Sequence, residues 1–306
     1  MKKVAFIFPG QGSQSVGMGH DLYENFETAK HVFEKADEVL GKSISKICFE
    51  GPEEDLKQTI NTQPAILTTS IAALEALKSK LDITPAYAAG HSLGEYAAYY
   101  ATGAVSLENA LKLIQKRAEL MDEVKGGSMA AVLNSDEETI KECISQSEGY
   151  VAIANYNSPK QIVITGDDNA VKQTCELLTA KGVRRVVPLA VSGAFHSEFM
   201  KDAGEKFAEF IQNIEVNNTE IAVVTNVDAE FTTSNFKEKM PKQIYSSVQW
   251  TQSVEKMIAQ GVDTFIEFGN GTVLAGLNKK INPEVTTLNV YDKESLENTI
   301  KVLSEV

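Results

Sequence analysis

The chain has 306 residues, of which 43% are hydrophobic, and its 29 Lys plus Arg against 42 Asp plus Glu give a formal net charge of −13 at pH 7. This composition is that of an ordinary globular protein and excludes collagen-like, disordered and disulfide-scaffold classes. The acidic balance repels phosphate backbones and anionic membrane surfaces, so we expect neither a nucleic-acid nor a membrane partner.

The cysteines and the N-terminus bear on the compartment. Cys48, Cys143 and Cys175 are odd in number and too widely spaced for a disulfide framework or a zinc site, which predicts reduced core thiols. The first apolar run, 4–8, is too short for a signal sequence, and no stretch approaches the roughly 20 apolar residues of a membrane helix. We therefore expect a cytoplasmic protein.

Short apolar runs and helical patterns alternate over the first 125 residues. The run 4–8 ends at Pro9-Gly10, as a strand buried on both faces does. This alternation predicts an α/β domain with a parallel sheet. The elements expected after that strand are helices 20–40 and 64–80, strand 86–90, and helices 93–102 and 107–124.

The alternation of buried strands and helices stops at Gly126-Gly127 and resumes near residue 196. Between them the order strand, helix, strand, strand, helix, strand is that of a ferredoxin-like unit. We expect a small domain, 127–190, inserted into a large domain made of 1–126 and 191–306. The expected elements are strand 129–133, a helix to about 146, strands 150–155 and 161–165, helix 168–181 and strand 184–189; then helix 196–213, strand 221–225, helices 235–247 and 251–260, strand 263–268, helix 272–281, strand 285–290 and helix 293–304.

The pentapeptide Gly90-His91-Ser92-Leu93-Gly94 matches Gly-x-Ser-x-Gly and lies between a predicted buried strand and a predicted helix. A nucleophilic serine needs this placement, because small flanking residues allow a strained turn that lifts the hydroxyl above the sheet edge. The alternative is a glycine-rich turn in which Ser92 only caps the following helix.

A serine hydroxyl is a weak nucleophile unless a base lies within hydrogen-bond reach. The chain has 4 histidines. His20 and His31 belong to the first long helix, and His91 adjoins Ser92 in the turn and should point away from it. His196, at the return from the small domain, remains as the candidate base; the alternative is a solvent-facing histidine at a helix start.

Arg117 lies on or beside the buried stripe of helix 107–124, three residues after Ile114 and four before Met121. A buried arginine needs an anion. That anion is either an internal Asp or Glu or a carboxylate that arrives with a substrate, and the helical pattern leaves both open.

The loop Gly10-Gln11-Gly12-Ser13-Gln14-Ser15 follows the first strand and invites a dinucleotide-binding interpretation. Ser15 stands where the third glycine of that fingerprint belongs, so the pattern is incomplete. In the other interpretation the loop brings Gln11 close to a reacting carbonyl, since oxyanion donors often come from a loop beside the serine turn.

Six motifs spread over nearly the whole chain are Gly10-Gln-Gly12, Gln63-Pro-Ala65, Gly90-His-Ser-Leu-Gly-Glu95, Arg117, Gly193-Ala-Phe-His-Ser197 and Val248-Gln-Trp250. As a set and in this order they resemble the malonyl-CoA:acyl carrier protein transacylase family. The resemblance implies an α/β fold: an α/β-hydrolase-like large domain with a parallel sheet and an inserted ferredoxin-like small domain.

The resemblance also implies catalytic roles. Ser92 resembles the nucleophile that takes up the malonyl group, and His196 resembles its general base. The family uses no acidic third member, and the backbone carbonyl that orients the imidazole matches Gln249. The backbone N–H groups of Gln11 and Leu93 resemble the oxyanion hole.

Further positions resemble those that contact the substrate. Arg117 resembles the clamp on the malonyl carboxylate, and Gln63, Met121 and Asn157 resemble pocket-lining residues. The triplet Ala194-Phe195-His196 resembles the malonyl-selecting form of this loop in related acyltransferases.

The reaction that this family resemblance implies is ping-pong transfer of a malonyl group from malonyl-CoA to the phosphopantetheine thiol of an acyl carrier protein, in fatty-acid biosynthesis. It requires no metal or other cofactor, and we expect a monomer. Carrier proteins of this system are acidic, so docking needs a basic surface, for which Lys181 with Arg184-Arg185 and Lys279-Lys280 are candidates.

Two other functions remain open from the motifs. The first is a serine esterase or thioesterase that uses Ser92 and His196 with water as the acceptor. The motifs leave it open because transfer differs from hydrolysis in the exclusion of water, which no motif reports. The second is a non-enzymatic dinucleotide-binding or scaffolding module built on the Gly10 loop.

Overall fold

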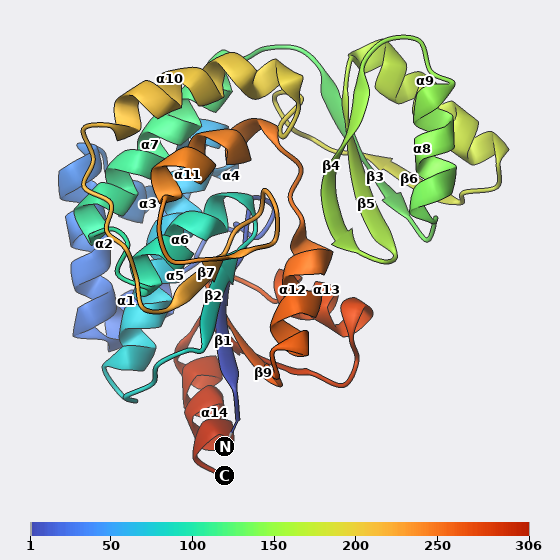
Figure 1. Cartoon of the computed structure of the whole chain (residues 1–306). Helices are drawn as coiled ribbons and strands as arrows, with labels where there is room; N and C mark the ends of the chain where they lie inside the picture. The colour runs from blue at the N-terminus through green and yellow to red at the C-terminus, as the bar shows by residue number, and fades with distance from the viewer. Residues whose placement is uncertain (1, 306) are drawn as a thin grey trace.

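The larger of two sheets is parallel except at one edge, as the alternation of strands and helices predicts (Figure 1). The structure is a computed structural model that describes residues 2–305. The sheet has the strand order β10-β9-β1-β2-β7-β8, and only β8 runs antiparallel to its neighbour. Its strands are β1 (Val4–Phe8), β2 (Tyr87–Gly90), β7 (Ala222–Val224), β8 (Phe231–Thr232), β9 (Thr264–Phe268) and β10 (Thr286–Val290).

Both faces of this sheet are buried, because alternate residues of β1 point into different cores. Phe6 and Phe8 join a core with the helices on one face, whereas Ala5 and Ile7 join a core with α12 and α13 on the other. The helices are α1 (His20–Asn25), α2 (Glu27–Leu40), α3 (Ile44–Glu50), α4 (Glu53–Leu56), α5 (Thr59–Lys78), α6 (Glu95–Ala101), α7 (Leu107–Glu123), α10 (Lys201–Ile211), α11 (Phe236–Tyr245), α12 (Trp250–Ala259), α13 (Val273–Ile281) and α14 (Lys293–Ser304).

Three predicted helices differ from the structure. The helix expected to begin at residue 196 begins at Lys201, after a single 3-10 turn at Glu198–Met200. The helix expected over 20–40 is interrupted at Phe26, whose backbone is extended. The helix expected to begin at Pro64 begins at Thr59, so the proline lies inside α5. A proline there frees the carbonyl four residues earlier, and Lys42 Nζ donates to that carbonyl, of Ile60, at 3.0 Å.

The smaller sheet is antiparallel, with the order β4-β5-β3-β6, and its helices α8 and α9 lie on its outer face (Figure 1). This strand order confirms the predicted ferredoxin-like unit and, with the parallel sheet, the predicted fold class. We propose 127–190 as the bounds of this domain. The elements are β3 (Ser128–Leu133), α8 (Glu137–Ser145), β4 (Val151–Ser158), β5 (Gln161–Gly166), α9 (Asp168–Ala180) and β6 (Arg185–Pro188).

A segment of the large domain, residues 247–251, hydrogen-bonds along β4, and we call it the seam. Val248 accepts from the Tyr156 N–H at 2.9 Å and donates to the Ala154 carbonyl at 2.8 Å. The hydroxyls of Ser247 and Thr251 donate to carbonyls of the same strand at 2.6 and 2.9 Å. The seam therefore joins the small sheet to the large domain along one edge.

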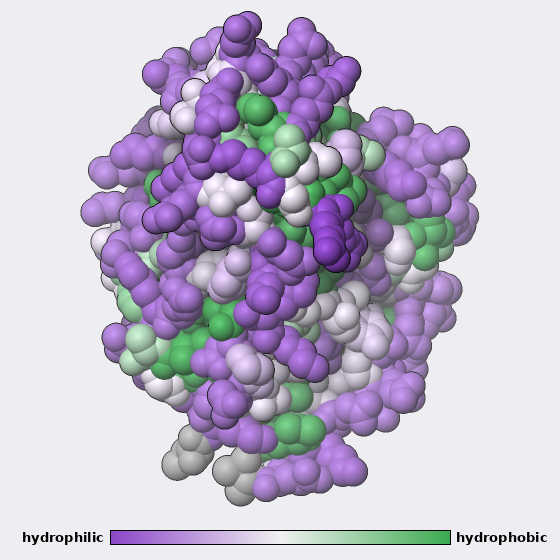
Figure 2. Space-filling model, turned by 90° about the vertical axis from the view of Figure 1, so that its right-hand side faces the viewer, coloured by the Kyte–Doolittle hydropathy of each residue, from purple (hydrophilic) through white to green (hydrophobic). Residues whose placement is uncertain are grey.

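The surface seen in Figure 2 is mostly hydrophilic, with apolar residues in separate patches. Within residues 2–305, no helix combines the length and the apolar character that crossing a membrane requires.

Cys48 and Cys143 are buried, Cys175 is partly buried, and all three are free thiols.

Candidate active site

Ser92 occupies the sharp turn between β2 and α6, with a left-handed φ of 51°. Both glycines of the Gly-x-Ser-x-Gly motif are required sterically. A Cβ on Gly90 would lie 1.9 Å from the carbonyl carbon of Gly94, and a Cβ on Gly94 would lie 2.2 Å from the Phe8 carbonyl oxygen. The motif therefore presses the serine turn against the end of β1.

Replacing Gly94 with Ala should lower the free energy of unfolding by about 3 kcal/mol or more, because the new methyl group overlaps backbone atoms. Gly276→Ala is the matched control: this glycine lies in α13 with no atom within 4 Å of the added Cβ. That change should stabilise the protein by about 0.5–1 kcal/mol through helix propensity. Chemical denaturation measures both variants, and similar changes in the two would contradict the packing argument.

His196 lies against the serine hydroxyl, with Nε2 2.8 Å from Ser92 Oγ. Its other ring nitrogen, Nδ1, lies 3.0 Å from the Gln243 carbonyl oxygen and 3.1 Å from the Ser246 carbonyl oxygen. Carbonyl oxygens only accept hydrogen bonds, so Nδ1 must carry the proton and donate it. Nε2 is then free to accept the Ser92 proton.

The prediction that the Gln249 carbonyl orients this imidazole was wrong. Gln249 is the N-cap of α12, and its carbonyl accepts from the N–H and the hydroxyl of Ser253. The carbonyls that hold His196 lie instead at the C-terminal end of α11, where the last carbonyls of a helix lack partners within it. Gln243 and Ser246 thus take the role expected of Gln249.

Arg117 reaches the same hydroxyl from α7. Its Nη2 donates to Ser92 Oγ at 3.0 Å and to Gln243 Oε1 at 3.0 Å, and Nη1 donates to Gln63 Oε1 at 2.7 Å. The side chain is only 1% exposed, yet no Asp or Glu carboxylate of residues 2–305 lies within 4.0 Å of it. The internal ion pair that the sequence left open is therefore absent from the described residues.

The electrostatics of the site keep the histidine neutral. Burial, the nearby Arg117 guanidinium and His91 together lower the pKa of His196 to about 3. Burial also lowers the pKa of Arg117, and a partial counter-charge comes from Glu95 beneath the site. A neutral imidazole and a cationic guanidinium thus converge on one serine hydroxyl.

A cavity of about 240 Å³ opens above this hydroxyl and is lined by both domains. The large domain contributes Gln11 and Leu93, the predicted oxyanion donors, together with Gln63 and Met121. The small domain contributes Asn157 from β4, which the family resemblance implied to be a pocket-lining residue. All of the predicted substrate-contacting residues therefore line one cavity.

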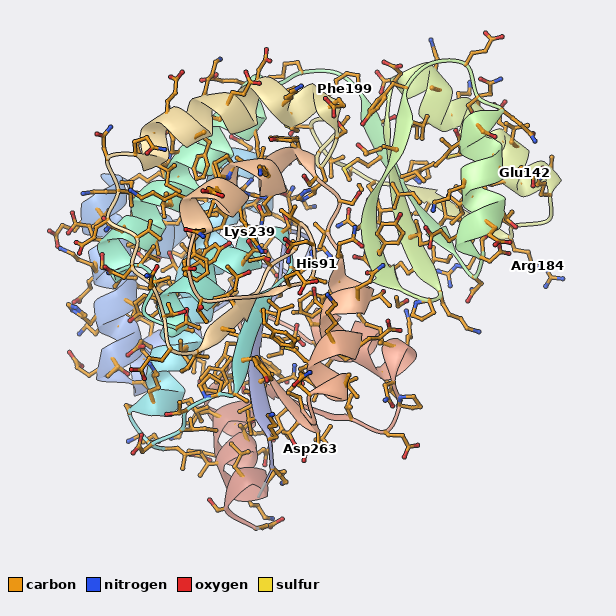
Figure 3. The ribbon with its side chains drawn as sticks, in the orientation of Figure 1. His91, Glu142, Arg184, Phe199, Lys239 and Asp263 are labelled. Atoms are coloured by element: carbon orange, nitrogen blue, oxygen red, sulfur yellow. The ribbon has the colours of Figure 1, made fainter. Side chains whose placement is uncertain are left out.

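His91 points toward the small domain, between the two sheets (Figure 3). Its Nε2 lies 2.7 Å from Asn157 Oδ1, and its ring packs 5.8 Å from that of Trp250. His91 therefore helps to hold the two domains together beside the serine turn, and its ring lines the same cavity.

The two basic clusters lie at different distances from the cavity. Arg184 and Glu142 both lie on the outer side of the small domain (Figure 3), and Lys181 pairs with Glu142 at 2.5 Å. Lys279 and Lys280 are exposed in the last turn of α13, the helix whose first turn lines the cavity.

Three residues that contribute to the site were missed by the sequence analysis. Gln243 contributes its carbonyl to His196 and its side-chain amide to Arg117 and to the Ser92 carbonyl. Ser246 contributes a carbonyl, and Asn226 binds the backbone of the serine turn. A backbone carbonyl has no residue-type signature, so only Asn226 and the Gln243 amide could have been suspected from the sequence.

The fold and this site define an acyltransferase, and comparison with known proteins agrees. The family model for the acyl transferase domain matches residues 5–287. The chain is 46% identical to the malonyl CoA-acyl carrier protein transacylase of Bacillus subtilis (strain 168), over 100% of this chain and 98% of that protein. The chain belongs to the acyl transferase family, within its malonyl CoA-acyl carrier protein transacylases.

Solved structures show the same likeness. The malonyl CoA-acyl carrier protein transacylase of Clostridium perfringens is similar with a TM-score of 0.94 and 42% identity, covering 99% of this chain and 98% of that one. A malonyl-transacylase solved in complex with a type II PKS acyl-carrier protein is similar with a TM-score of 0.95 and 36% identity, covering 98% and 100%.

Proposed function

We propose that the chain transfers a malonyl group from malonyl-CoA to the phosphopantetheine thiol of an acyl carrier protein, through a malonyl ester of Ser92. One observation carries the residue roles: the Ser92 hydroxyl lies 2.8 Å from a neutral His196 and 3.0 Å from Arg117, whose charge has no carboxylate partner among the described residues. The names of the relatives support the two substrates.

In the first half-reaction Ser92 Oγ attacks the thioester carbonyl carbon while its proton passes to His196 Nε2. The negative charge that develops on the carbonyl oxygen is stabilised by the backbone N–H groups of Gln11 and Leu93. Collapse of this intermediate breaks the carbon–sulfur bond, and His196 returns the proton to the departing CoA thiolate. Gln243 and Ser246 stabilise the imidazolium through Nδ1.

Arg117 selects the acyl group in this proposal. Its hydrogen-bond partners among the amides, Gln63 and Gln243, are neutral, and the counter-charge from Glu95 is only partial. A carboxylate at the far end of a three-carbon acyl group supplies the missing negative charge. Its two oxygens also match the fork of a guanidinium in a bidentate pair. An acetyl group offers only a methyl group to the same site.

The substrate carboxylate also tunes the base. Arg117 is one cause of the low pKa of His196, and pairing with malonyl compensates that positive charge. The pKa of His196 then rises toward the working pH, where a general base is most effective. Malonyl binding thus activates the base that acts on it.

In the second half-reaction the carrier thiol attacks the ester carbonyl, His196 takes the thiol proton, and the released Ser92 oxygen recovers a proton from His196. The cavity lining favours a thiol over water, because several of its side chains are apolar. These include Met121, Met129, Ala131, Val163, Leu189, Val191 and Leu274.

The direct test is to incubate the protein with malonyl-CoA and follow the mass of the intact chain. The proposal predicts an adduct of one malonyl group that is stable in buffer and disappears on adding holo acyl carrier protein. Equally fast decay without the carrier would identify a hydrolase. Absence of any adduct would overturn the proposal.

His196→Ala should slow formation of the adduct by about 10²–10⁴-fold, the usual effect of base assistance.

In the unaltered enzyme, kcat/KM for malonyl-CoA should stay nearly flat from pH 8 to pH 5.5. The pKa of free His196 is lowered to about 3, so the neutral form persists far below the usual 6.5. The acid limb of kcat should appear at higher pH than that of kcat/KM, because bound malonyl raises this pKa. A kcat/KM limb near pH 6.5 would contradict the lowered pKa of His196 in the free enzyme.

A further inference from the structure

The side chain of Asn226 spans the serine turn. Its Oδ1 accepts from the Ser92 N–H at 2.8 Å, and its Nδ2 donates to the Gly90 carbonyl at 2.7 Å. Asn226 is only 1% exposed. It does not line the cavity, and it makes no hydrogen bond with Arg117. One amide group thus holds the backbone on both sides of His91, immediately before the nucleophile.

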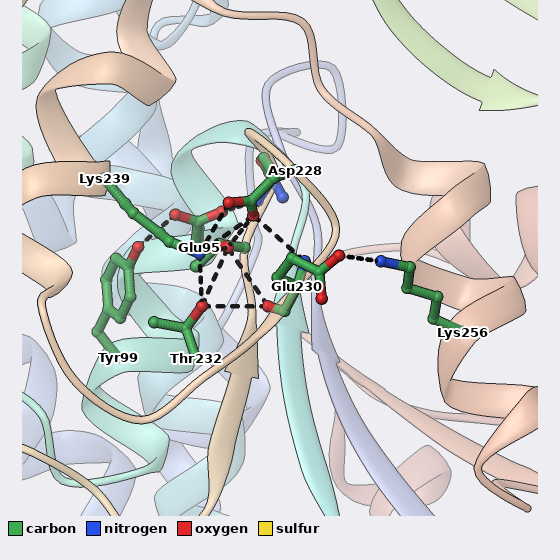
Figure 4. Close-up of polar contacts among 9 residues, drawn as sticks. Glu95, Tyr99, Asp228, Glu230, Thr232, Lys239 and Lys256 are labelled. Carbon is green, nitrogen blue, oxygen red and sulfur yellow. Dashed lines mark hydrogen bonds and ion pairs between the residues drawn. The ribbon is translucent and has the colours of Figure 1, made fainter.

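Asn226 is itself fixed by a buried carboxylate. Its backbone N–H donates to Glu95 Oε2 at 2.6 Å, and the other oxygen of Glu95 accepts from the Tyr99 hydroxyl. Figure 4 shows Glu95 between Tyr99 and the loop that carries Asp228. Glu95, the first residue of α6, therefore fixes Asn226, and Asn226 in turn fixes the serine turn that precedes α6.

The loop of Asn226 is also pinned from α11. Lys239 Nζ donates to Thr225 Oγ1 at 3.1 Å and to Thr232 Oγ1 at 2.7 Å, and pairs with the Asp228 carboxylate at 2.9 Å (Figure 4). Four residues further along the same helix, Gln243 Nε2 donates to the Ser92 carbonyl at 2.7 Å. The carbonyl of Gln243 holds His196, so one framework positions both partners of the pair.

We infer that Asn226 is a positioning residue for the reaction, and that Glu95 acts through it. This inference rests on the proposed role of Ser92 as the nucleophile. A left-handed backbone is unfavourable for serine and persists only where its surroundings determine it. Asn226 supplies that determination by satisfying the Ser92 N–H and the Gly90 carbonyl together.

Kinetics can distinguish a positioning role of Asn226 from a role in binding the substrate. Asn226 fixes the direction of Oγ relative to His196 but does not contact the substrate cavity. Its loss should therefore lower the reactivity of Ser92 and leave the KM for malonyl-CoA within about 3-fold. A fluorophosphonate, which reacts with activated serines and has no carboxylate for Arg117, should lose reactivity in the same proportion as malonyl-CoA.

Asn226→Ala should slow acylation of Ser92 by both reagents about 10²-fold, the effect expected from a displacement of roughly 1 Å at a reacting group. Asn226→Asp provides a second variant that keeps the size of the side chain. Its protonated form donates to Gly90 and accepts from Ser92 as asparagine does, whereas its ionised form places a charge against the Gly90 carbonyl. The ratio of variant to unaltered rate should therefore rise at least 5-fold as the pH falls from 8 to 5.5.

Three further variants serve as comparisons and controls. Glu95→Gln keeps an oxygen for the Asn226 N–H and should stay within about 3-fold of the unaltered rate, whereas Glu95→Ala should fall at least 10-fold. Lys256→Ala breaks only the exposed ion pair with Glu230 on the same loop and should change nothing. Melting curves identify folded variants.

Two results would overturn the inference: a folded Asn226→Ala that reacts with the fluorophosphonate at the unaltered rate, or an Asn226→Asp ratio that does not change with pH. If Asn226→Ala does not fold, the pH dependence of Asn226→Asp decides. Failure of the malonyl adduct in the unaltered protein would refute the proposed function, and the fluorophosphonate comparison would still decide the role of Asn226.

Discussion

Ser92→Ala should eliminate the malonyl adduct and lower malonyl transfer by at least about 10⁴-fold, because no other group in the cavity replaces an activated serine oxygen. The fold should be retained. Alanine meets the left-handed φ of 51° with the same Cβ as serine, and Arg117 keeps its bonds to Gln63 and Gln243. Intact mass after incubation with malonyl-CoA measures the adduct, and thermal melting measures stability.

Ser192→Ala is the matched control for this change. Ser192 lies near the cavity, and its hydroxyl bonds only to Thr59 Oγ1, at 3.3 Å, among the side chains described. This variant should form the adduct at the unaltered rate. An adduct that survives in Ser92→Ala would place the nucleophile on another residue.

Arg117→Ala should lower malonyl transfer by about 10²–10³-fold and preserve or raise transfer of acetyl. A bidentate pair with a carboxylate contributes charge-assisted hydrogen bonds of about 1.5–3 kcal/mol each, and each 1.4 kcal/mol corresponds to a factor of ten. Acetyl has no carboxylate to pair with the guanidinium, and in this variant its methyl group no longer lies against a charge that is only partly compensated. Rates of transfer from malonyl-CoA and acetyl-CoA to the same carrier give the comparison.

The melting temperature of the Arg117→Ala variant distinguishes a role in binding the malonyl carboxylate from a purely structural role. Had the guanidinium paired with a buried acid, its removal would cost about 3–5 kcal/mol and lower transfer of every acyl group alike. The described partners are neutral amides and a hydroxyl beside a cavity, so the melting temperature should change little. Arg117→Lys should recover only part of the malonyl rate, because an ammonium cannot reproduce the fork. Equal losses for malonyl and acetyl, with a large fall in melting temperature, would contradict the clamp.

The sequence predicted the buried framework well because hydrophobic periodicity reports burial directly. The run 4–8 became β1 without a change of boundary, and helix 107–124 became α7 with Arg117 on its buried stripe. The short helices α3 and α4 were missed because fewer than two turns show little periodicity. The carbonyl that Pro64 frees, that of Ile60, accepts from Lys42, 18 residues earlier in the chain, and local patterns do not report such a partner.

The site was predictable where chemistry depends on side-chain type and not where it depends on the backbone. Ser92, His196 and Arg117 have side chains that few other residues replace. The carbonyls of Gln243 and Ser246 could belong to any residue, and the motif around Gln249 pointed to a carbonyl already bound within α12. No local pattern marks Asn226, because the partners of its side chain lie more than 130 residues away in the chain.

The seam connects the small sheet to the catalytic base through continuous backbone. Residues 247–251 bind along β4, and the carbonyl of the adjoining Ser246 accepts a hydrogen bond from His196. At the opposite edge of the small sheet, Leu189 and Val191 follow β6 and line the cavity. The same sheet therefore forms a wall of the acyl pocket and, through the seam, supports the backbone that orients the base.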